Sequence, residues 1–375
     1  MVTKIYIVRH AEAEGNIYRR SHGWYDAYLT ENGLRQVDNL AKRMEGVHLD
    51  VIYSSDLRRT MQTAEAPRRA SGLPVIPEKG LRELQMGEWE NLSWGDCSRR
   101  DAVLASSFAQ SEDWRSPGAE SVQDLIDRTG ETLRRLVKKH EGQSICLVSH
   151  SVAIRALMLN MGVEEKTFRD TKMVPNASLS LIEYEDGVYR PIFLGDNAHN
   201  ADAPLHMAHP FGGSLERPTL WFRSARPDES GIAADLWSEA WMAVYGNLRA
   251  FDFGFADMRI SAMIEENRDA VRFAFCGEEL AGVIVLDRFA DEADTMHIVL
   301  FMLREKFRGH GLAVQLIGEA VTCARLAGET TLRLRVAKKN KHAIALYEQN
   351  GFMTTSKEVG DLVMKKWVFP VKVLD

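Results

Sequence analysis

An arginine and a histidine stand together at the end of the first apolar run of the chain. The run Ile5-Tyr6-Ile7-Val8 is short and β-rich, and Arg9-His10 follows it directly. Open α/β sheets place their ligands at the carboxyl ends of buried strands, so a cation and an imidazole at this point are well placed for chemistry. An incidental Arg-His pair at a strand end is the alternative interpretation, because short motifs also occur by chance.

Three later segments carry residues of the same kind. They are residues 54–64 with Arg59, residues 81–90 with Glu83, and residues 147–151 with His150. In order and rough spacing they resemble, together with residues 5–16, the motifs of the histidine phosphatase superfamily. The resemblance is to its phosphoglycerate-mutase-like branch, whose signature is usually written R-H-G-E-T-x-x-N, and it covers about residues 1 to 200.

Phosphoryl transfer needs the residue types found in these segments. A phosphate monoester is a dianion whose transferring group spreads charge over its equatorial oxygens, so catalysis depends mostly on positioning and fixed positive charge. The guanidinium groups of Arg9 and Arg59 are planar forks that match phosphate oxygens, whereas a lysine would be only a point charge.

The resemblance implies a role for each residue. His10 would be the nucleophile, forming a phosphohistidine that water then hydrolyses without a metal. His150 would donate to the transferring oxygens, and Glu83 would protonate the leaving oxygen and then activate water. The expected catalytic residues of this half are His10, Arg9, Arg59, Glu83 and His150. The expected phosphate-binding residues are Arg9, Asn16, Arg59 and His150.

Neighbouring residues offer alternatives. Arg58 could bind phosphate in place of Arg59, but the Leu-x-Arg-x-x-x-Thr-Ala spacing favours Arg59. Glu88 and Glu90 are interpreted as surface charges, because Glu83 alone occupies the Leu-x-Glu position. Three other histidines are expected at ordinary polar positions: His22, His140 and His199. Three aromatic residues are candidates to border the phosphate site: Trp24, Tyr25 and Tyr28.

Length and composition indicate how many domains the chain forms and which partners to expect. At roughly 100–200 residues per domain, a chain of 375 residues with 45% hydrophobic and 27% charged residues is expected to form two globular domains. A formal net charge of −6 gives no reason to expect a nucleic-acid partner. The sequence contains no long apolar stretch, so a membrane partner is not expected. Four scattered cysteines without a C-x-x-C pair suggest neither a zinc site nor a disulfide framework, so we expect a reduced, cytoplasmic protein.

Strands and helices alternate through the first half. The pattern predicts strands at 4–8, 51–54 and 145–149, and helices at about 32–45, about 57–70 and from Ser121 onward. Such alternation predicts a three-layer α/β sandwich with a mainly parallel sheet. The resemblance implies that this sandwich is phosphoglycerate-mutase-like. His10 and His150 both leave strands, so one edge of the sheet can hold them.

A change in composition near residue 201 indicates a domain boundary. Residues 201–217 contain two prolines, a Gly-Gly pair and the linker histidines His206 and His209, with no periodic pattern. We therefore expect a histidine phosphatase domain at 1–200, a linker at 201–217 and a second domain at 218–375.

The second half contains a candidate anion site. A strand is expected at 220–223, then a helix with Trp237 and Trp241 on a core face, and a hairpin over 270–286. A strand at about 296–303 leads into Arg308-Gly309-His310-Gly311-Leu312-Ala313, which opens a helix that continues to Gly328. Glycines at such a point allow close backbone approach, and the amides and dipole of the helix face an anion.

This loop looks like the R-x-x-G-x-A pyrophosphate loop of GNAT N-acetyltransferases. Asn340, Ala343, Tyr347 and Gly351-Phe352 resemble the second signature of that family. The resemblance covers about residues 218 to 370 and implies an α+β acyltransferase fold that binds acetyl-CoA. The implied cofactor-binding residues are Arg308, Gly309, His310, Gly311, Leu312, Ala313 and Asn340.

The resemblance also implies that Tyr347 protonates the departing CoA thiolate, although Tyr347 could instead only pack with Leu346 and Phe352. No general base is evident. His297, Glu305 and Asp287 are candidates, and a water chain would also serve.

These patterns predict a bifunctional enzyme. Its first domain would hydrolyse a small-molecule phosphate ester, and its second would transfer an acetyl group to an amine acceptor. The alternatives are a phosphoglycerate-type mutase in the first domain and a non-catalytic acetyl-CoA-sensing module in the second.

Overall fold

The computed structural model describes residues 1–163, 174–203, 218–289 and 292–374. Most of the expected linker, including His206 and His209, therefore lies outside the described residues. The chain divides into two compact units. The first comprises Met1–Leu92, Asp101–Gly212 and Lys372–Asp375, and the second comprises Ser93–Arg100 and Gly213–Val371. Neither unit is one continuous stretch of sequence.

The first unit is built on a six-stranded sheet of order β3-β2-β4-β1-β5-β6. Its strands are β1 (Thr3–Arg9), β2 (Val51–Ser54), β3 (Val75–Pro77), β4 (Ser144–Ser149), β5 (Leu179–Glu185) and β6 (Val188–Asp196). The first four are parallel to one another, and β5 and β6 are antiparallel at one edge. The expectation of a mainly parallel sheet is confirmed.

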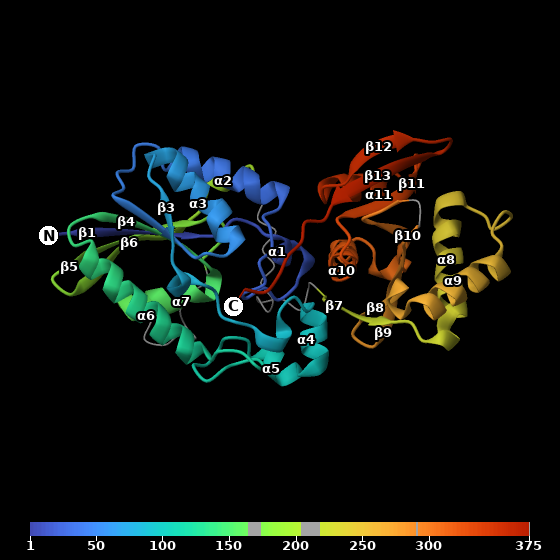
Figure 1. The fold of residues 1–375 in the computed structure, drawn as a ribbon, viewed down its shortest axis with the longest axis horizontal. Coiled ribbons are helices and arrows are strands. Elements are labelled where there is room, and N and C mark those ends of the chain that lie inside the picture. The colour runs from blue at the N-terminus through green and yellow to red at the C-terminus, as the bar shows by residue number, and fades with distance from the viewer. Residues whose placement is uncertain (164–173, 204–217, 290–291, 375) are drawn as a thin grey trace. The chain divides into compact units, whose positions relative to one another are not determined.

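Helices cover both faces of this sheet (Figure 1). Helices α2 (Glu31–Arg43) and α3 (Arg58–Ser71) lie on one face, and α6 (Val122–Lys139) and α7 (Ser151–Met161) on the other. Successive side chains of a strand point to opposite faces of the sheet, so β1 contributes to two separate cores. Ile5 and Ile7 pack with α6 and α7, while Val8 packs with α2. This is the predicted three-layer sandwich.

Residues around Ser121 fix the start of helix α6, which precedes β4, the strand that leads to His150. The Ser121 hydroxyl accepts from the amide of Asp124, and the Asp124 carboxylate accepts from the amide of Ser121, as the Ser-x-x-Asp pattern predicts. Strands β1 and β4 then pair in parallel with Arg9 opposite Ser149. Consequently His10 and His150 leave adjacent strands at the same edge of the sheet.

The second unit contains a seven-stranded sheet of order β12-β13-β11-β10-β9-β8-β7. Its strands are β7 (Leu220–Ser224), β8 (Val271–Cys276), β9 (Glu279–Asp287), β10 (Thr295–Leu303), β11 (Thr331–Ala337), β12 (Met353–Lys357) and β13 (Asp361–Trp367). Strands β10 and β11 are parallel but pair only from Thr295 to Ile298 of β10, so they diverge beyond that residue. A bulge between Ile298 and Leu300 lies at the same point.

Helices α8 (Ser230–Tyr245) and α9 (Phe253–Glu266) lie on one side of this sheet and α10 (Ala313–Leu326) on the other (Figure 1). Helix α11 (Lys341–Gln349) precedes β12. The buried face of α8 is formed by Ala233, Ala234 and Leu236, not by the tryptophans. Trp237 and Trp241 are only half-buried, and Trp237 packs against the core cluster from its margin of partly buried residues.

The remaining elements are short. They are α1 (Glu14–Tyr18), α4 (Trp94–Arg100), α5 (Ala102–Ser106), and the 3-10 turns η1 (Lys79–Leu81), η2 (Gly87–Trp89), η3 (Ala198–Asn200), η4 (Pro227–Glu229), η5 (Arg268–Ala270) and η6 (Glu305–Phe307). Among the described residues, no helix is long and apolar enough to cross a membrane.

Within the second unit, the segment that carries α4 covers the outer strand of the sheet. The Ser93 hydroxyl donates to the carbonyl oxygen of Leu220 at 2.8 Å, and the Asp96 carboxylate accepts from the amide of Phe222 at 3.2 Å. These contacts satisfy backbone groups of an edge strand that would otherwise be open to pairing with another chain.

Candidate active sites

The two strand-end histidines meet. The ring centroids of His10 and His150 are 5.3 Å apart, and the residues are 2% and 0% exposed. Nδ1 of His10 lies 2.7 Å from the carbonyl oxygen of Ala11. Because a carbonyl can only accept, Nδ1 carries the proton and the lone pair is on Nε2.

Both histidines are held in the neutral form. Burial, followed by the charge of Arg59, lowers the pKa of His10 well below its usual value. Burial and Arg59 lower the pKa of His150 in the same way. A neutral imidazole with a free Nε2 is the form that can attack phosphorus.

Two buried arginines supply the positive charge. Arg9 donates through Nη1 to the carbonyl oxygen of Val174 at 2.6 Å. Arg59 donates to three carbonyl oxygens, those of His22 at 3.1 Å, Gly23 at 2.8 Å and Tyr25 at 3.1 Å. Burial lowers the pKa of each guanidinium to about 10, so both remain charged at neutral pH.

Three buried nitrogen atoms of this cluster have no hydrogen-bond partner in the described structure. They are Nε of Arg9, Nε of Arg59 and Nδ1 of His150. An unsatisfied buried donor costs ~1–3 kcal/mol. An anionic ligand with several acceptor oxygens would remove that cost.

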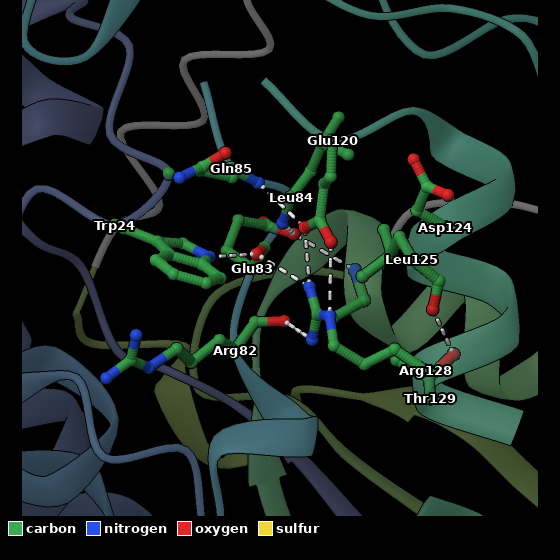
Figure 2. Close-up of polar contacts among 12 residues, drawn as sticks. Trp24, Arg82, Glu83, Leu84, Gln85, Glu120, Asp124, Leu125, Arg128 and Thr129 are labelled. Atoms are coloured by element: carbon green, nitrogen blue, oxygen red, sulfur yellow. Dashed lines mark hydrogen bonds and ion pairs between the residues drawn. The ribbon is translucent and has the colours of Figure 1, made fainter. Parts of the chain in front are cut away.

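Glu83 lies at the amino-terminal end of α7. Its carboxylate accepts from the amides of Val152 at 3.2 Å and Ala153 at 3.0 Å. Figure 2 shows how its backbone is fixed: Arg128 donates to the carbonyl oxygen of Glu83 and pairs with Glu120 at 2.6 Å. The resulting network holds this carboxylate on one rigid segment.

Asn16 makes structural contacts within the first unit. Its Oδ1 accepts from the amide of Ala13 at 2.9 Å and from Nδ2 of Asn176 at 3.4 Å. Asn176 also donates to the carbonyl oxygen of His10 at 3.0 Å. Asn176 is therefore a site residue that the sequence analysis missed, and no local pattern around it gives a signal.

Two expectations for this half are wrong. The ring of His22, expected at an ordinary polar position, lies 6.0 Å from that of His10. Burial and Arg59 lower its pKa to about 3. Glu90 is not a surface charge: its half-buried carboxylate accepts from the amides of Trp24, Tyr25 and Met86. Glu88 is exposed, as expected.

The neighbours of Arg59 have other contacts. Arg58 is 34% exposed, pairs with Asp26 and lies over the ring of Tyr28. The indole nitrogen of Trp24 donates to the carbonyl oxygen of Glu83 at 2.8 Å. The geometry thus favours Arg59 over Arg58 as a phosphate ligand.

This arrangement suits an anionic substrate. Arg9 and Arg59 are charged, and three imidazoles are neutral. Among the described residues, no group of three or more His, Cys, Asp and Glu side chains is placed to hold a metal ion. The site can therefore bind a phosphoryl group through arginines and present a histidine lone pair to it.

The second site is the loop that opens α10. Gly309 and Gly311 have φ values of 78° and 70°, where a β-carbon would be strained, and no atom lies within 4 Å of a β-carbon built at either. Leu312 precedes the helix without a side-chain cap. Exposed amides and the helix dipole can therefore face a pyrophosphate. Arg308 donates through Nε to the carbonyl oxygen of Leu303, which anchors the loop.

Tyr347 is buried between Phe301 and Phe352, at centroid distances of 5.6 and 5.4 Å. Phe301 belongs to the part of β10 that has diverged from β11. Burial raises the pKa of the Tyr347 phenol, so it remains a proton donor. Asn340 is the N-cap of α11 and accepts from the amide of Ala343 at 3.2 Å. Its side chain already has this structural contact.

The three candidate bases differ in their surroundings. His297 is buried, with Nε2 2.8 Å from the carboxylate of Glu292, and it precedes the last residue at which β10 pairs with β11. Burial lowers the pKa of His297. Asp287 pairs with Arg259 at 3.7 Å, and Glu305 is exposed. His297 is thus the candidate that lies beside the divergence of the strands.

The fold of each unit agrees with comparisons to known proteins. Residues 5–197 match the histidine phosphatase superfamily (branch 1), and residues 233–352 match the acetyltransferase (GNAT) family. The chain belongs to the histidine phosphatase superfamily, and its second half carries a GNAT domain. The resemblances seen in the sequence are confirmed.

Individual relatives match the first half. The probable phosphoglycerate mutase GpmB of Proteus mirabilis is 33% identical over 185 residues, which cover 49% of this chain and 86% of that protein. GpmB of Salmonella choleraesuis is 32% identical with the same coverage. The solved structure of Bacillus stearothermophilus YhfR is similar with a TM-score of 0.50 and 30% identity, covering 52% of this chain and 98% of that one.

Proposed function

We propose that the first domain is a metal-independent phosphomonoester hydrolase that works through a phosphohistidine on His10. The observation that carries this proposal is the buried cluster of His10, His150, Arg9 and Arg59, with three unpartnered buried nitrogens. Such a cluster is stabilised by an anion that accepts several hydrogen bonds at once.

In this mechanism Nε2 of His10 attacks phosphorus while Arg9 and Arg59 bind the equatorial oxygens. Glu83 gives a proton to the leaving oxygen, and the P–O bond to the alcohol breaks. Glu83 then takes a proton from water, which attacks the phosphohistidine and releases inorganic phosphate and neutral His10. His150 donates to the transferring oxygens in both steps.

A phosphoglycerate-type mutase is the second candidate, because the relatives of Proteus and Salmonella bear that name. A mutase must return the phosphoryl group to its substrate before water reaches it, which requires closure over the site. The test is to compare the rate of phosphate release with the rate of phosphoglycerate interconversion on the purified chain. Faster interconversion than release would overturn the proposal of hydrolysis.

We further propose that the second domain transfers an acetyl group from acetyl-CoA to an amine. The positive-φ glycines and uncapped start of α10 support pyrophosphate binding there. His297, paired with Glu292, would take the proton of the amine, and Tyr347 would protonate the thiolate as the C–S bond breaks. An amine is proposed as the acceptor because the second half matches the acetyltransferase (GNAT) family.

The experiment is thiol release from acetyl-CoA with a panel of small amines, using His297→Gln and Glu305→Gln. We expect His297→Gln to lower kcat about 10²-fold without changing acetyl-CoA affinity, and Glu305→Gln to match the wild type. Tight acetyl-CoA binding without thiol release for any amine would favour the sensing module instead.

A further inference from the structure

The last described residues of the chain form part of the phosphatase unit. Val373 makes an antiparallel bridge with Tyr25. The amide of Asp26 donates to the carbonyl oxygen of Lys372 at 3.0 Å, and the amide of Leu374 donates to the carbonyl oxygen of Trp24 at 3.2 Å. Residues 372–374 therefore run as a short strand beside residues 24–26. We call residues 372–374 the C-terminal strand.

The segment paired with this strand is the one that holds Arg59. Residues 22–26 supply the three carbonyl oxygens that accept from its guanidinium, those of His22, Gly23 and Tyr25. The Glu90 carboxylate accepts from the amides of Trp24 and Tyr25 of the same segment at 2.6 and 2.8 Å.

The C-terminal strand completes this hydrogen bonding. The carbonyl oxygen of Trp24 and the amide of Asp26 are the groups that face it. Residues 22–26 lie in no helix or strand of three or more residues, so side chains and this pairing fix their geometry. Without the pairing, the segment that holds Arg59 would lose the two backbone hydrogen bonds made by Trp24 and Asp26 to residues 372–374.

We propose that the C-terminal strand is a positioning element for the phosphatase site, acting through residues 22–26 on Arg59. The proposal rests on the phosphoryl-transfer function proposed above. The strand touches no reacting atom in this scheme. The strand lies outside residues 5–197, the part that matches the phosphatase family, so residues 372–374 would be an addition to the site beyond that part.

Leu374→Pro in the full-length chain tests the proposal, because proline removes the amide that donates to Trp24. Leu374→Ala is the matched control, since it shortens the side chain but keeps that amide. A chain ending at Val371 is the second variant. We expect kcat/KM for p-nitrophenyl phosphate to fall about tenfold in Leu374→Pro and in the shortened chain, since small misplacements of a positioned group are costly. Leu374→Ala should retain wild-type kcat/KM within about twofold.

Two further measurements separate this proposal from the function on which it rests. Amide hydrogen exchange of a peptide covering residues 22–28 should accelerate in Leu374→Pro and not in Leu374→Ala. Unaltered exchange would overturn the pairing. Faster exchange with unaltered kcat/KM would overturn the positioning role.

If the wild-type chain hydrolyses no phosphate ester, the proposed function fails, and affinity for inorganic phosphate becomes the readout. Weaker phosphate binding in Leu374→Pro than in Leu374→Ala would still support the positioning of Arg59. Equal binding would overturn it.

Discussion

The imidazole rings of His10 and His22 lie 6.0 Å apart, in an edge-to-face arrangement. His22 fits there because Gly15 has no side chain: a β-carbon at Gly15 would lie 2.0 Å from Nδ1 of His22. A third imidazole therefore lies beside the ring of His10, and burial lowers the pKa of all three, so they are uncharged at neutral pH.

The low pKa of His22 predicts a pH-dependent stability. Its folded pKa is about 3, below the unfolded value of 6.5. Below pH 6.5 the unfolded chain binds a proton that the folded chain does not, so the free energy of unfolding falls until about pH 3. The fall is about 1.4 kcal/mol per pH unit.

Urea unfolding at pH 7 and 5.5 measures this effect. His22→Gln should reduce the loss of stability between these pH values by roughly 1 kcal/mol relative to the wild type. His48→Gln, which alters an 80% exposed ring, is the control. An unchanged pH dependence in His22→Gln would show that His22 is accessible to protons in the folded state.

Arg59 and Arg58 provide a matched pair. Arg59→Lys removes the planar fork and most contacts to the carbonyl oxygens, so kcat/KM for an aryl phosphate should fall about 10²–10³-fold. Arg58→Lys keeps the positive charge beside Asp26 at a partly exposed position, so it should change kcat/KM less than about threefold. A larger effect at Arg58 would reverse the assignment of the phosphate ligand.

Glu90 and Glu88 give a second pair. The Glu90 carboxylate accepts three backbone amides, and Glu90→Gln would turn an NH₂ group toward at least one of them. We expect a loss of about 1–3 kcal/mol in the free energy of unfolding. Glu88→Gln should be neutral in the same denaturation experiment, and equal effects would argue against a special role for Glu90.

The loop before α10 is tested by Gly311→Ala. A β-carbon at φ 70° costs about 1–2 kcal/mol. If the loop must keep this conformation to bind pyrophosphate, acetyl-CoA affinity measured by calorimetry should fall about tenfold. Gly277→Ala, at φ 58° in the hairpin turn between β8 and β9, carries similar strain away from the loop. The acetyl-CoA affinity of Gly277→Ala should match that of the wild type. A loss of affinity equal to that of Gly311→Ala would indicate global destabilisation.

The sequence predicted the parts of the site that follow from strand ends and helix starts. Arg9 ends a strand and His10 and His150 directly follow strands whose hydrophobic pattern is plain, and Arg59 lies in the first turn of a helix that a spacing motif marks. The cap at Ser121 was likewise readable, because its hydrogen bonds are local.

The residues that were missed reach the site through distant contacts. Asn176 bonds to a residue 166 positions earlier, and no periodic pattern records such a pairing. Glu90 looked exposed because its partners are backbone amides of residues 24 and 25. The C-terminal strand pairs with the same segment by backbone alone, so its side chains carry no signal.

The most direct test of the account is trapping the phosphoryl-enzyme by rapid quench with a ³²P-labelled aryl phosphate. A phosphohistidine mechanism predicts an acid-labile, alkali-stable label on His10, more of it in Glu83→Gln because water activation slows, and none in His10→Ala. Label on another residue, or full turnover by His10→Ala, would contradict it.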